Sequence, residues 1–415
     1  MMKSTFKKIN IGSELSACIK LTLTGILTLL WSKKLKSQDI WLLSEKNSEA
    51  RDNGYHLYQY LVMKHPECCF YYVIKKGSPD ENKLSADRVI YYNSWRHCYY
   101  SFLAKNQVGG QVHFNRPYYK ESRLSKILYN IFVRKDQQRV FLHHGICKDN
   151  IPQAYDYRQS KYTLMISGAK PEYDYFKKIY SLPDDKIALT GLPRFDNLYD
   201  WKSAAKRQIL IMPTFRRALA PADSRLPIAR VEELERFERS EFCKTYVSLL
   251  NNNTLRAFIE ETKVNLIFYL HFTFQPYRPV FERLVNPHKY IKIANRLEFD
   301  VQQLLLESKL LITDFSSVFF DFAYMGKPLI YYQFDKDEYR KGHYAEGYFV
   351  YERDGFGPVI KEENSLIPQI IKTINNDFVV SEEYSKKSST FFVPHDKENC
   401  QRVYNVINNS DNTNL

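Results

Sequence analysis

Short apolar runs alternate with helix-like stretches along most of the chain, and this alternation restricts the possible folds more than any other feature of the sequence. In the first half, expected strands lie at 40–44, 69–74, 88–92, 112–114, 139–145 and 162–167, and expected helices near 54–64, 95–104 and 171–181. Strands that alternate with helices build β-α-β units, whose strands form a parallel sheet. The sequence therefore predicts an α/β fold.

The same alternation restarts after a polar, lysine-bearing link near residues 199–206. Its expected strands lie at 208–216, 264–272, 290–294, 310–313 and 328–332, and its helices near 240–262, 300–308 and 316–324. At 415 residues the chain exceeds the usual single hydrophobic core. We predict two Rossmann-like domains, 39–200 and 201–400, and a C-terminal tail at 401–415. Facing each other, they would form a cleft at the carboxyl ends of their strands, where parallel sheets bind ligands.

Residues 1–38 contain an apolar run from Leu21 to Trp31, flanked by Lys20 and a second basic cluster. The run is too short to span a bilayer. No small-residue cleavage site follows it, as a signal peptide would require. Two interpretations stay open: an amphipathic helix on an anionic membrane surface, or a helix that packs on the protein itself. The first predicts a peripheral protein on the cytoplasmic face of the cell membrane.

The formal net charge of +13 indicates an anionic partner, such as a membrane surface, a phosphate-bearing substrate or nucleic acid. Lysine and arginine are scattered and no zinc-finger, ribonucleoprotein or basic-zipper signature is present, so nucleic acid ranks last. The seven cysteines are odd in number and include no C-x-x-C pair. This pattern fits neither a disulfide framework nor a thiolate zinc site, and it favours a reducing compartment.

The stretch LLITDFSSVFFDFAYMGKPLIYYQFD, residues 310–335, places acids and serines inside an apolar, aromatic run. Its DFSS segment falls at a predicted turn from strand to helix. Such a turn presents unpaired backbone N–H groups and the positive end of the helix dipole, and the hydroxyls of Ser316 and Ser317 complete a phosphate cradle. The alternative is that Asp314 and Ser316 only cap the helix. Asp321, inside the helix, either holds the turn or orients a ligand hydroxyl.

Two predicted strand ends carry histidines. FLHHG places His143 and His144 at the end of a strand in the first domain, and FYLHF places His271 near the end of a strand in the second. A lone histidine at a strand end is more often structural than catalytic, but one from each domain at the same cleft favours function. Neutral imidazole suits the removal of a proton from a hydroxyl that attacks phosphorus. Arg194 and Arg216, which follow apolar strands, are candidates to offset pyrophosphate charge.

Taken in order, these blocks resemble the CDP-glycerol glycerophosphotransferase family, whose members build or prime teichoic acids and related phosphate-linked polymers. The resemblance extends over about residues 40–400, and TDFSSVFFDFAYMGKP is its most specific block. The other blocks are LSEKNSEARDNGYHLYQYL, FLHHGICK, SGAKPEYDYF, TGLPRFDNL, ILIMPTFR and the GPVI near 357–360. The resemblance implies a glycosyltransferase-B-like fold, in which the C-terminal half binds most of the nucleotide.

The resemblance also implies a reaction. Glycerol phosphate moves from CDP-glycerol to a hydroxyl of a lipid-linked or polymer acceptor, in the synthesis of a teichoic-acid-like or capsular polymer, and CMP leaves. The family's base falls on His144. Its second essential histidine falls on His271, which Phe272 follows where the family usually has proline. The HGICKD block lacks the threonine that relatives tend to have after the glycine, so acceptor contacts differ there and Lys148 remains a candidate contact.

The resulting scheme places the donor pyrophosphate at the serines of the DFSS turn. It requires no cofactor or resident metal and is compatible with a magnesium ion on the pyrophosphate. One rival is a glycosyltransferase-B enzyme with another donor, such as CDP-ribitol or a nucleotide sugar; the other is a non-catalytic phosphate-binding or membrane-surface protein. The predicted site comprises catalytic His144 and His271; donor-binding Asp314, Ser316, Ser317, Arg216 and Asp321; and acceptor or phosphate contacts Lys148 and Arg194.

Overall fold

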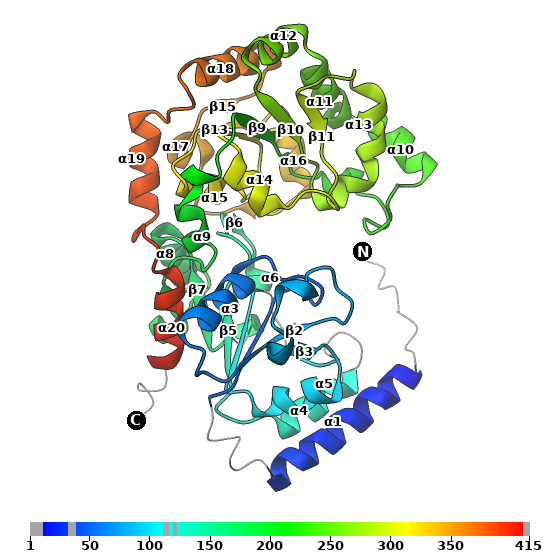
Figure 1. The fold of residues 1–415 in the computed structure, drawn as a ribbon, viewed down its shortest axis with the longest axis vertical. Helices are drawn as coiled ribbons and strands as arrows, with labels where there is room; N and C mark the ends of the chain where they lie inside the picture. Colours follow the sequence, from blue (N-terminus) through cyan, green and yellow to red (C-terminus); the bar gives the residue numbers. More distant parts are fainter. Residues whose placement is uncertain (1–10, 32–38, 111–115, 119–122, 161, 410–415) are drawn as a thin grey trace. The chain divides into compact units, whose positions relative to one another are not determined.

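The computed structural model describes residues 11–31, 39–110, 116–118, 123–160 and 162–409, which form two compact units (Figure 1). Unit 1 comprises the chain up to His144, Pro152–Asp196 and the segment from Asp396 onward, whereas unit 2 comprises Gly145–Ile151 and Asn197–His395. The chain therefore leaves unit 1 after Asp196, slightly before the predicted link. The chain also changes unit after His144, Ile151 and His395. No change in composition marks these three places in the sequence.

Unit 1 is built on a seven-stranded parallel sheet with the order β3-β2-β1-β4-β5-β7-β8. Its strands are β1 Trp41–Ser44, β2 Phe70–Ile74, β3 Val89–Tyr91, β4 Asn106–Gly109, β5 Gln138–Phe141, β7 Leu164–Ser167 and β8 Ile187–Leu189. Leu43 and Leu42 belong to separate apolar clusters, since neighbouring side chains of a strand point to opposite faces. Apolar side chains on both faces explain why β1 reads as a continuous apolar run.

The helices of unit 1 cover this sheet. They are α1 Ile11–Trp31, α3 Asn53–Lys64, α4 Trp95–Leu103, α5 Arg123–Phe132, α6 Pro152–Tyr155, α7 Tyr157–Ser160, α8 Lys170–Ile179 and α20 Asn399–Asn409. Helix α20 packs against α3, and its buried Cys400, Val403 and Ile407 join the core of unit 1. The predicted C-terminal tail from residue 401 is therefore wrong for residues up to 409, because that segment buries an apolar helix face.

The strand predicted at 112–114 lies outside the described residues. The strand that precedes β5 is instead β4, whose sequence NQVG gives no apolar signal. Asn106 and Gln107 are nevertheless buried, and the Gln107 amide donates to the hydroxyl of Tyr129 at 2.6 Å. A polar strand of this kind is hidden from a search for apolar runs because its partners lie elsewhere in the sequence.

Helix α1 packs on α4 and α5. Ala17, Leu21 and Thr24 are buried on this side, and the position of Gly25 leaves no room for a Cβ atom, which would clash with the ring of Phe132. The interpretation that this helix packs on the protein is therefore confirmed for its inner face. Among the described residues, no helix is both long and apolar enough to cross a membrane.

Unit 2 contains a six-stranded parallel sheet with the order β11-β10-β9-β12-β13-β15. These strands are β9 Gln208–Ile211, β10 Asn265–Phe268, β11 Ile291–Ile293, β12 Leu310–Thr313, β13 Leu329–Tyr332 and β15 Val359–Ile360. A separate antiparallel pair joins β6 (Asp149–Asn150) to β14 (Ala345–Glu346). In both sheets the strand order runs outward in two directions from the first strand of the unit, β1 or β9, as in doubly wound folds.

The helices of unit 2 are α10 Val231–Glu238, α11 Glu241–Asn251, α12 Asn253–Thr262, α13 Arg278–Leu284, α14 Val301–Glu307, α15 Phe319–Tyr324, α16 Lys336–Gly342, α17 Tyr351–Asp354, α18 Glu363–Asn375 and α19 Glu382–Phe391. In α9, Phe195–Tyr199, the chain passes from unit 1 to unit 2. Short 3-10 turns occur at Glu81–Lys83, Ala86–Arg88, Asp184–Lys186, Trp201–Ser203, Arg217–Leu219 and Phe272–Tyr277. Helix α15 begins at Phe319, so the helix predicted from residue 316 is shorter than expected.

Lys327 closes the end of α14. Its side chain is buried, and its ammonium donates to the carbonyls of Leu305, Leu306 and Ser308 at 2.7, 2.8 and 2.8 Å. The last carbonyls of a helix have no partner within the helix, so Lys327 supplies one. The ammonium also lies 4.4 Å from the ring centroid of Trp201, which adds a cation–π contact.

Replacing Lys327 with methionine should lower the free energy of unfolding by at least about 1–3 kcal/mol, because buried carbonyls lose their hydrogen-bond donor. Chemical denaturation of the purified protein measures this change. Lys361→Met is the matched control, since Lys361 is exposed, and it should stay within about 0.5 kcal/mol of the parent. Equal stability of the two variants would contradict the assigned role of Lys327.

Candidate functional site

The turn after β5 separates the two neighbouring histidines of FLHHG. His143 has a φ of 60° and is fully buried, with its ring stacked against Tyr155 at 5.1 Å and Phe176 at 5.5 Å between centroids. Its ring nitrogens are buried without a hydrogen-bond partner, and burial holds its pKa well below the usual value. His143 is thus a neutral core side chain, whereas His144 is exposed at the carboxyl edge of the sheet.

The backbone that carries His144 is held from two other segments. The amide of Asn53 donates to the carbonyls of Leu142 at 3.3 Å and His143 at 3.0 Å, and its oxygen accepts from the backbone N–H of Arg194. Gly110 lies so close that a Cβ there would be 3.1 Å from the carbonyl oxygen of His143. Asn53 therefore joins α3, the histidine turn and the GLPRF segment, none of which signals this role in the sequence.

Asp52 and Arg194 form an ion pair beside this turn, with 2.7 Å between Oδ1 and the guanidinium. Burial raises the pKa of the Asp52 carboxyl, but Arg194, His144 and the backbone N–H of Asn53 together lower it by more, so the net shift is downward. Glu45 lies next to the pair and accepts from the backbone N–H groups of Arg51, Asp52 and Tyr55 at the start of α3. Arg194 was predicted as a phosphate contact; the structure buries it and pairs it with a carboxylate.

The electrostatic setting of His144 suits a base. The side chain reaches solvent, but the protein around it displaces part of its water and lowers its pKa from the ordinary 6.5; the Asp52 carboxylate opposes that shift, and Arg194 adds to it. The ring is therefore neutral near pH 7. When it accepts a proton, the Asp52 carboxylate stabilises the imidazolium, as an acid beside a catalytic histidine does in acyl-transfer enzymes.

In unit 2, Asp314 and Arg216 face inward. Asp314 is fully buried; its Oδ1 accepts from the backbone N–H and hydroxyl of Thr214 at 2.9 and 2.7 Å. Arg216 lies 2.9 Å from Asp314 Oδ2 and donates to both oxygens of Asp335 at 2.7 Å. These side chains connect the loops after β9, β12 and β13, so the structure gives them a framework position rather than a solvent-facing one.

The two serines of the DFSS turn remain accessible: Ser316 is half-buried and Ser317 is exposed. Both precede α15, and the backbone N–H of Phe320 donates to the Ser317 carbonyl at 3.1 Å. Asp321 is buried inside α15. The hydroxyls, rather than a long helix dipole, are therefore what this turn offers to a phosphate.

His271 caps the 3-10 turn after β10. Its Nδ1 accepts from the backbone N–H of Thr273 at 3.2 Å, so the neutral ring carries its proton on Nε2. Its ring stacks on Phe215, with centroids 4.8 Å apart. His271 is half-buried and, as a neutral side chain, presents a hydrogen-bond donor rather than a base.

Sequence reasoning missed His343, whose ring also contacts Phe215, edge to face, with centroids 5.2 Å apart. Its Nε2 accepts from the backbone N–H of Arg217 at 3.2 Å, and burial, with Arg217 and Arg216 nearby, lowers its pKa to about 4. It follows α16 rather than a strand, so no strand-end signal pointed to it.

Lys148 lies in unit 2 and not in the first predicted domain. It is buried and its ammonium pairs with Asp149, which also pairs with Arg340 at 2.8 Å. Burial lowers the pKa of Lys148, and Asp149 opposes that shift. The structure therefore places this predicted phosphate contact inside an ion-pair network at the β6–β14 pair.

A cavity of about 1020 Å³ lies at the amino edge of the unit 2 sheet, away from the DFSS turn. Pro328 and Leu329 at the start of β13 and Pro358 before β15 line it, and Lys372 is its lone cation among the lining residues. With one cation among its lining residues, this cavity does not match a nucleoside diphosphate. The carboxyl edges of the two sheets remain the candidate sites.

The chain was compared with known proteins. Residues 26–409 match the family model described as CDP-Glycerol:Poly(glycerophosphate) glycerophosphotransferase. The minor teichoic acid biosynthesis protein GgaB of Bacillus subtilis is 32% identical over 90% of this chain and 40% of its own length. The teichoic acid poly(ribitol-phosphate) polymerase of Bacillus spizizenii is 23% identical over 90% of this chain and 56% of its own length. The chain thus spans only about two fifths to three fifths of these relatives.

Solved structures confirm the glycosyltransferase-B-like fold. The wall teichoic acid polymerase TagF superposes with a TM-score of 0.66 at 15% identity, covering 98% of this chain and 100% of that one. A putative UDP-N-acetylglucosamine 2-epimerase from Listeria monocytogenes superposes with a TM-score of 0.55 at 13% identity, covering 91% of this chain and 98% of that one. Since the family match covers nearly all of the described residues, this chain belongs to the CDP-glycerol:poly(glycerophosphate) glycerophosphotransferase family.

Proposed function

We propose that the chain transfers glycerol phosphate, or a related alditol phosphate, from its CDP derivative to a hydroxyl of a lipid-linked or polymer acceptor. The product is part of a teichoic-acid-like or capsular polymer, and CMP is released. The observation that carries this proposal is the exposed, neutral His144 beside the Asp52 carboxylate at the carboxyl edge of unit 1. Family membership supports the donor class.

In this mechanism His144 accepts the proton of the acceptor hydroxyl as its oxygen attacks the distal phosphorus of the donor. The new O–P bond forms while the bond from that phosphorus to the CMP oxygen breaks, and CMP leaves with the electron pair. His271 Nε2–H and the hydroxyls of Ser316 and Ser317 donate to phosphate oxygens. Preorganised donors of this kind supply most of the stabilisation in phosphoryl transfer.

The buried charged residues position other groups and do not contact the substrate in this mechanism. Asp314 and Arg216 hold the loop that presents the serines, and Arg194 keeps Asp52 ionised. Asp321 is buried inside α15 and does not face a ligand. Lys148 pairs with Asp149 of β6, which Arg340 also binds. The scheme needs no resident metal; a magnesium ion that arrives on the pyrophosphate is compatible with it.

A second candidate donor is CDP-ribitol. The relative from Bacillus spizizenii, named as a poly(ribitol-phosphate) polymerase, matches 90% of this chain. The two donors differ only in the alditol beyond the distal phosphate, so the site described above serves either one.

Purified protein incubated with CDP-glycerol and a lipid-linked acceptor should release CMP and add glycerol phosphate to the acceptor. His144→Ala should lower turnover by about 10²–10⁴-fold, the usual contribution of a general base, and should retain CDP-glycerol binding. Mass spectrometry of the product and calorimetric binding measure the two effects. His288→Ala, which removes a half-buried histidine paired with Glu260, is the control and should keep normal turnover.

CDP-ribitol and UDP-sugars are the comparison donors in the same assay. Faster release of CMP from CDP-ribitol would replace glycerol by ribitol. Release of UDP from a nucleotide sugar would overturn the transfer of an alditol phosphate. Binding of CDP-glycerol with no turnover of any donor would support the non-catalytic alternative.

The pH profile of kcat/KM should show a rising limb below the ordinary histidine value of 6.5, because the pKa of His144 is lowered. Activity appears as His144 loses its proton, so the rate increases with pH through this pKa and is level near neutrality. Asp52→Asn removes the charge that raises this pKa, and it should move the limb to lower pH. A limb above 6.5, or one that Asp52→Asn moves upward, would contradict the assignment of His144 as the base.

We also propose that unit 1 contacts an anionic membrane surface peripherally. Although α1 packs on the protein, it leaves Leu15, Leu29 and Leu30 exposed by 61%, 63% and 68%, and α5 leaves Ile127 and Ile131 exposed by 58% and 64%. Two helices that pack on each other therefore both expose aliphatic side chains, in a protein with a formal net charge of +13. Such surfaces bind lipid headgroup regions.

Leu30→Glu should weaken sedimentation with vesicles that contain anionic lipid by about tenfold, since one buried leucine contributes about 1.5–3 kcal/mol. Leu297→Glu is the matched control because Leu297 is 86% exposed in unit 2. Equal binding of the parent and both variants would refute the membrane contact through α1. Failure of the parent to sediment with any vesicle would do the same.

A further inference from the structure

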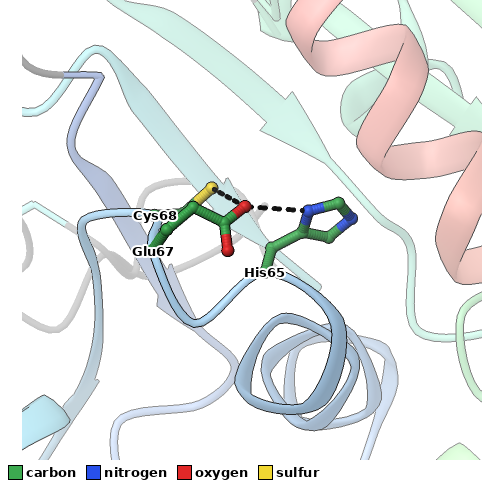
Figure 2. A group of neighbouring side chains, drawn as sticks. All are labelled: His65, Glu67 and Cys68. Atoms are coloured by element: carbon green, nitrogen blue, oxygen red, sulfur yellow. Dashed lines mark hydrogen bonds and ion pairs between the residues drawn. The ribbon is translucent and has the colours of Figure 1, made fainter.

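The turn between α3 and β2 brings three different metal-ligand side chains together. His65, Glu67 and Cys68 point toward one another, and the Glu67 carboxylate lies between the imidazole and the thiol (Figure 2). His65 Nδ1 and Glu67 Oε1 are 3.3 Å apart, and Cys68 Sγ and Glu67 Oε1 are 3.9 Å apart. All three ligand atoms lie within 4.8 Å of one another.

The backbone of this turn is fixed in place. Arg88 donates to the carbonyls of Pro66 at 2.8 Å and Cys68 at 2.9 Å, and its guanidinium lies 4.3 Å from the ring centroid of Phe70. The backbone N–H of Cys68 donates to the His65 carbonyl at 3.1 Å. The turn is therefore preorganised, and only side-chain rotations separate it from a coordination geometry.

A chain of hydrogen bonds orients the ring of His65. The Gln401 amide donates to Asn405, so its oxygen is free to accept, and it accepts from the hydroxyl of Tyr60. The Tyr60 oxygen then accepts from His65 Nε2, 3.3 Å away. Tyr60 thus occupies Nε2, and Nδ1, which lies 3.3 Å from Glu67 Oε1, is the ring nitrogen left for an ion. Metal-ligating histidines are oriented in this way by a partner at the other ring nitrogen.

Tyr404 of α20 completes the surroundings. Its ring stacks on His65 with centroids 3.8 Å apart, and its hydroxyl lies 3.6 Å from Cys68 Sγ. Tyr404 therefore contacts two of the three ligand side chains, one through its ring and one through its hydroxyl.

We propose that His65 Nδ1, a Glu67 carboxylate oxygen and Cys68 Sγ bind one transition-metal ion, with Zn²⁺ as the preferred ion. Thiolate and imidazole select zinc over Mg²⁺ or Ca²⁺, which take oxygen ligands. At Zn–ligand distances of about 2.0–2.3 Å, tetrahedral ligand atoms lie roughly 3.3–3.7 Å apart, close to the two separations from Glu67 Oε1, and the third pair lies within 4.8 Å. Three protein ligands leave the fourth position to water.

The site is independent of the proposed transferase chemistry. It lies before the amino end of β2, whereas His144 follows the carboxyl end of β5 in the same parallel sheet. The side chain of Glu67 is 67% exposed, so an ion reaches the site from solvent. Through Tyr404, a bound ion would fasten α20 to the turn that follows α3. The cysteine spacing of the sequence indicates no thiolate zinc site, but it cannot reveal a site made of one imidazole, one carboxylate and one thiolate.

Titration of the untagged full chain with Co²⁺ near neutral pH tests the proposal. One equivalent should produce tetrahedral d–d absorption and a sulfur-to-cobalt charge-transfer band, and Zn²⁺ should displace the cobalt and raise the melting temperature. Cys68→Ser should abolish the charge-transfer band, and His65→Gln should abolish binding. Tyr60→Phe, which removes the acceptor at Nε2, should weaken the affinity by about 10–100-fold.

Cys69→Ser is the matched control, because Cys69 adjoins the site, is half-buried like Cys68 and contacts Tyr71 instead. It should keep the full spectrum. Absence of the band in the parent protein would overturn the proposal and leave His65 and Glu67 as an ordinary ion pair. Loss of the band in Cys69→Ser, or its survival in Cys68→Ser, would also overturn the proposed ligand set.

Discussion

The buried carboxylate of Asp314 is the interaction on which the organisation of unit 2 depends. Asp314 is the first residue after β12, and it binds Thr214 from the loop after β9 and Arg216, which in turn binds Asp335 after β13. An unpaired charge at such depth costs several kcal/mol. The three loops are therefore held in one arrangement, and the accessible serines of the DFSS turn are carried on it.

In unit 1, different polar groups hold the loops at the carboxyl edge of the sheet. Glu45 accepts three backbone N–H groups at the start of α3, and Asn53 holds two carbonyls of the histidine turn. Burial and the Asp52 charge raise the pKa of Glu45 to about 8 against these hydrogen bonds. In both units, buried polar groups outside the catalytic set keep the carboxyl edge of a parallel sheet rigid.

Much of the fold followed from the sequence, because strand ends in parallel sheets are local features. The apolar runs located most of the parallel strands, and the ends of β5 and β10 carry the predicted His144 and His271. Prediction failed for β4, whose side chains are polar, and for α20, whose apolar face fits unit 1 far from it in sequence. Runs of apolar residues predict which segments are buried. They do not predict which polar residues are buried with hydrogen-bond partners.

The sequence by itself determined two parallel α/β sheets and the positions of the histidines and serines at their strand ends, since periodicity and turn residues act over a few positions. Only the tertiary structure decided which of these side chains are accessible. Asp314, Arg216, Arg194 and Lys148 were conspicuous as charges in apolar surroundings, and all four are buried in ion pairs. Their partners are mostly distant in sequence, and a buried charge is stable only where folding supplies such a partner.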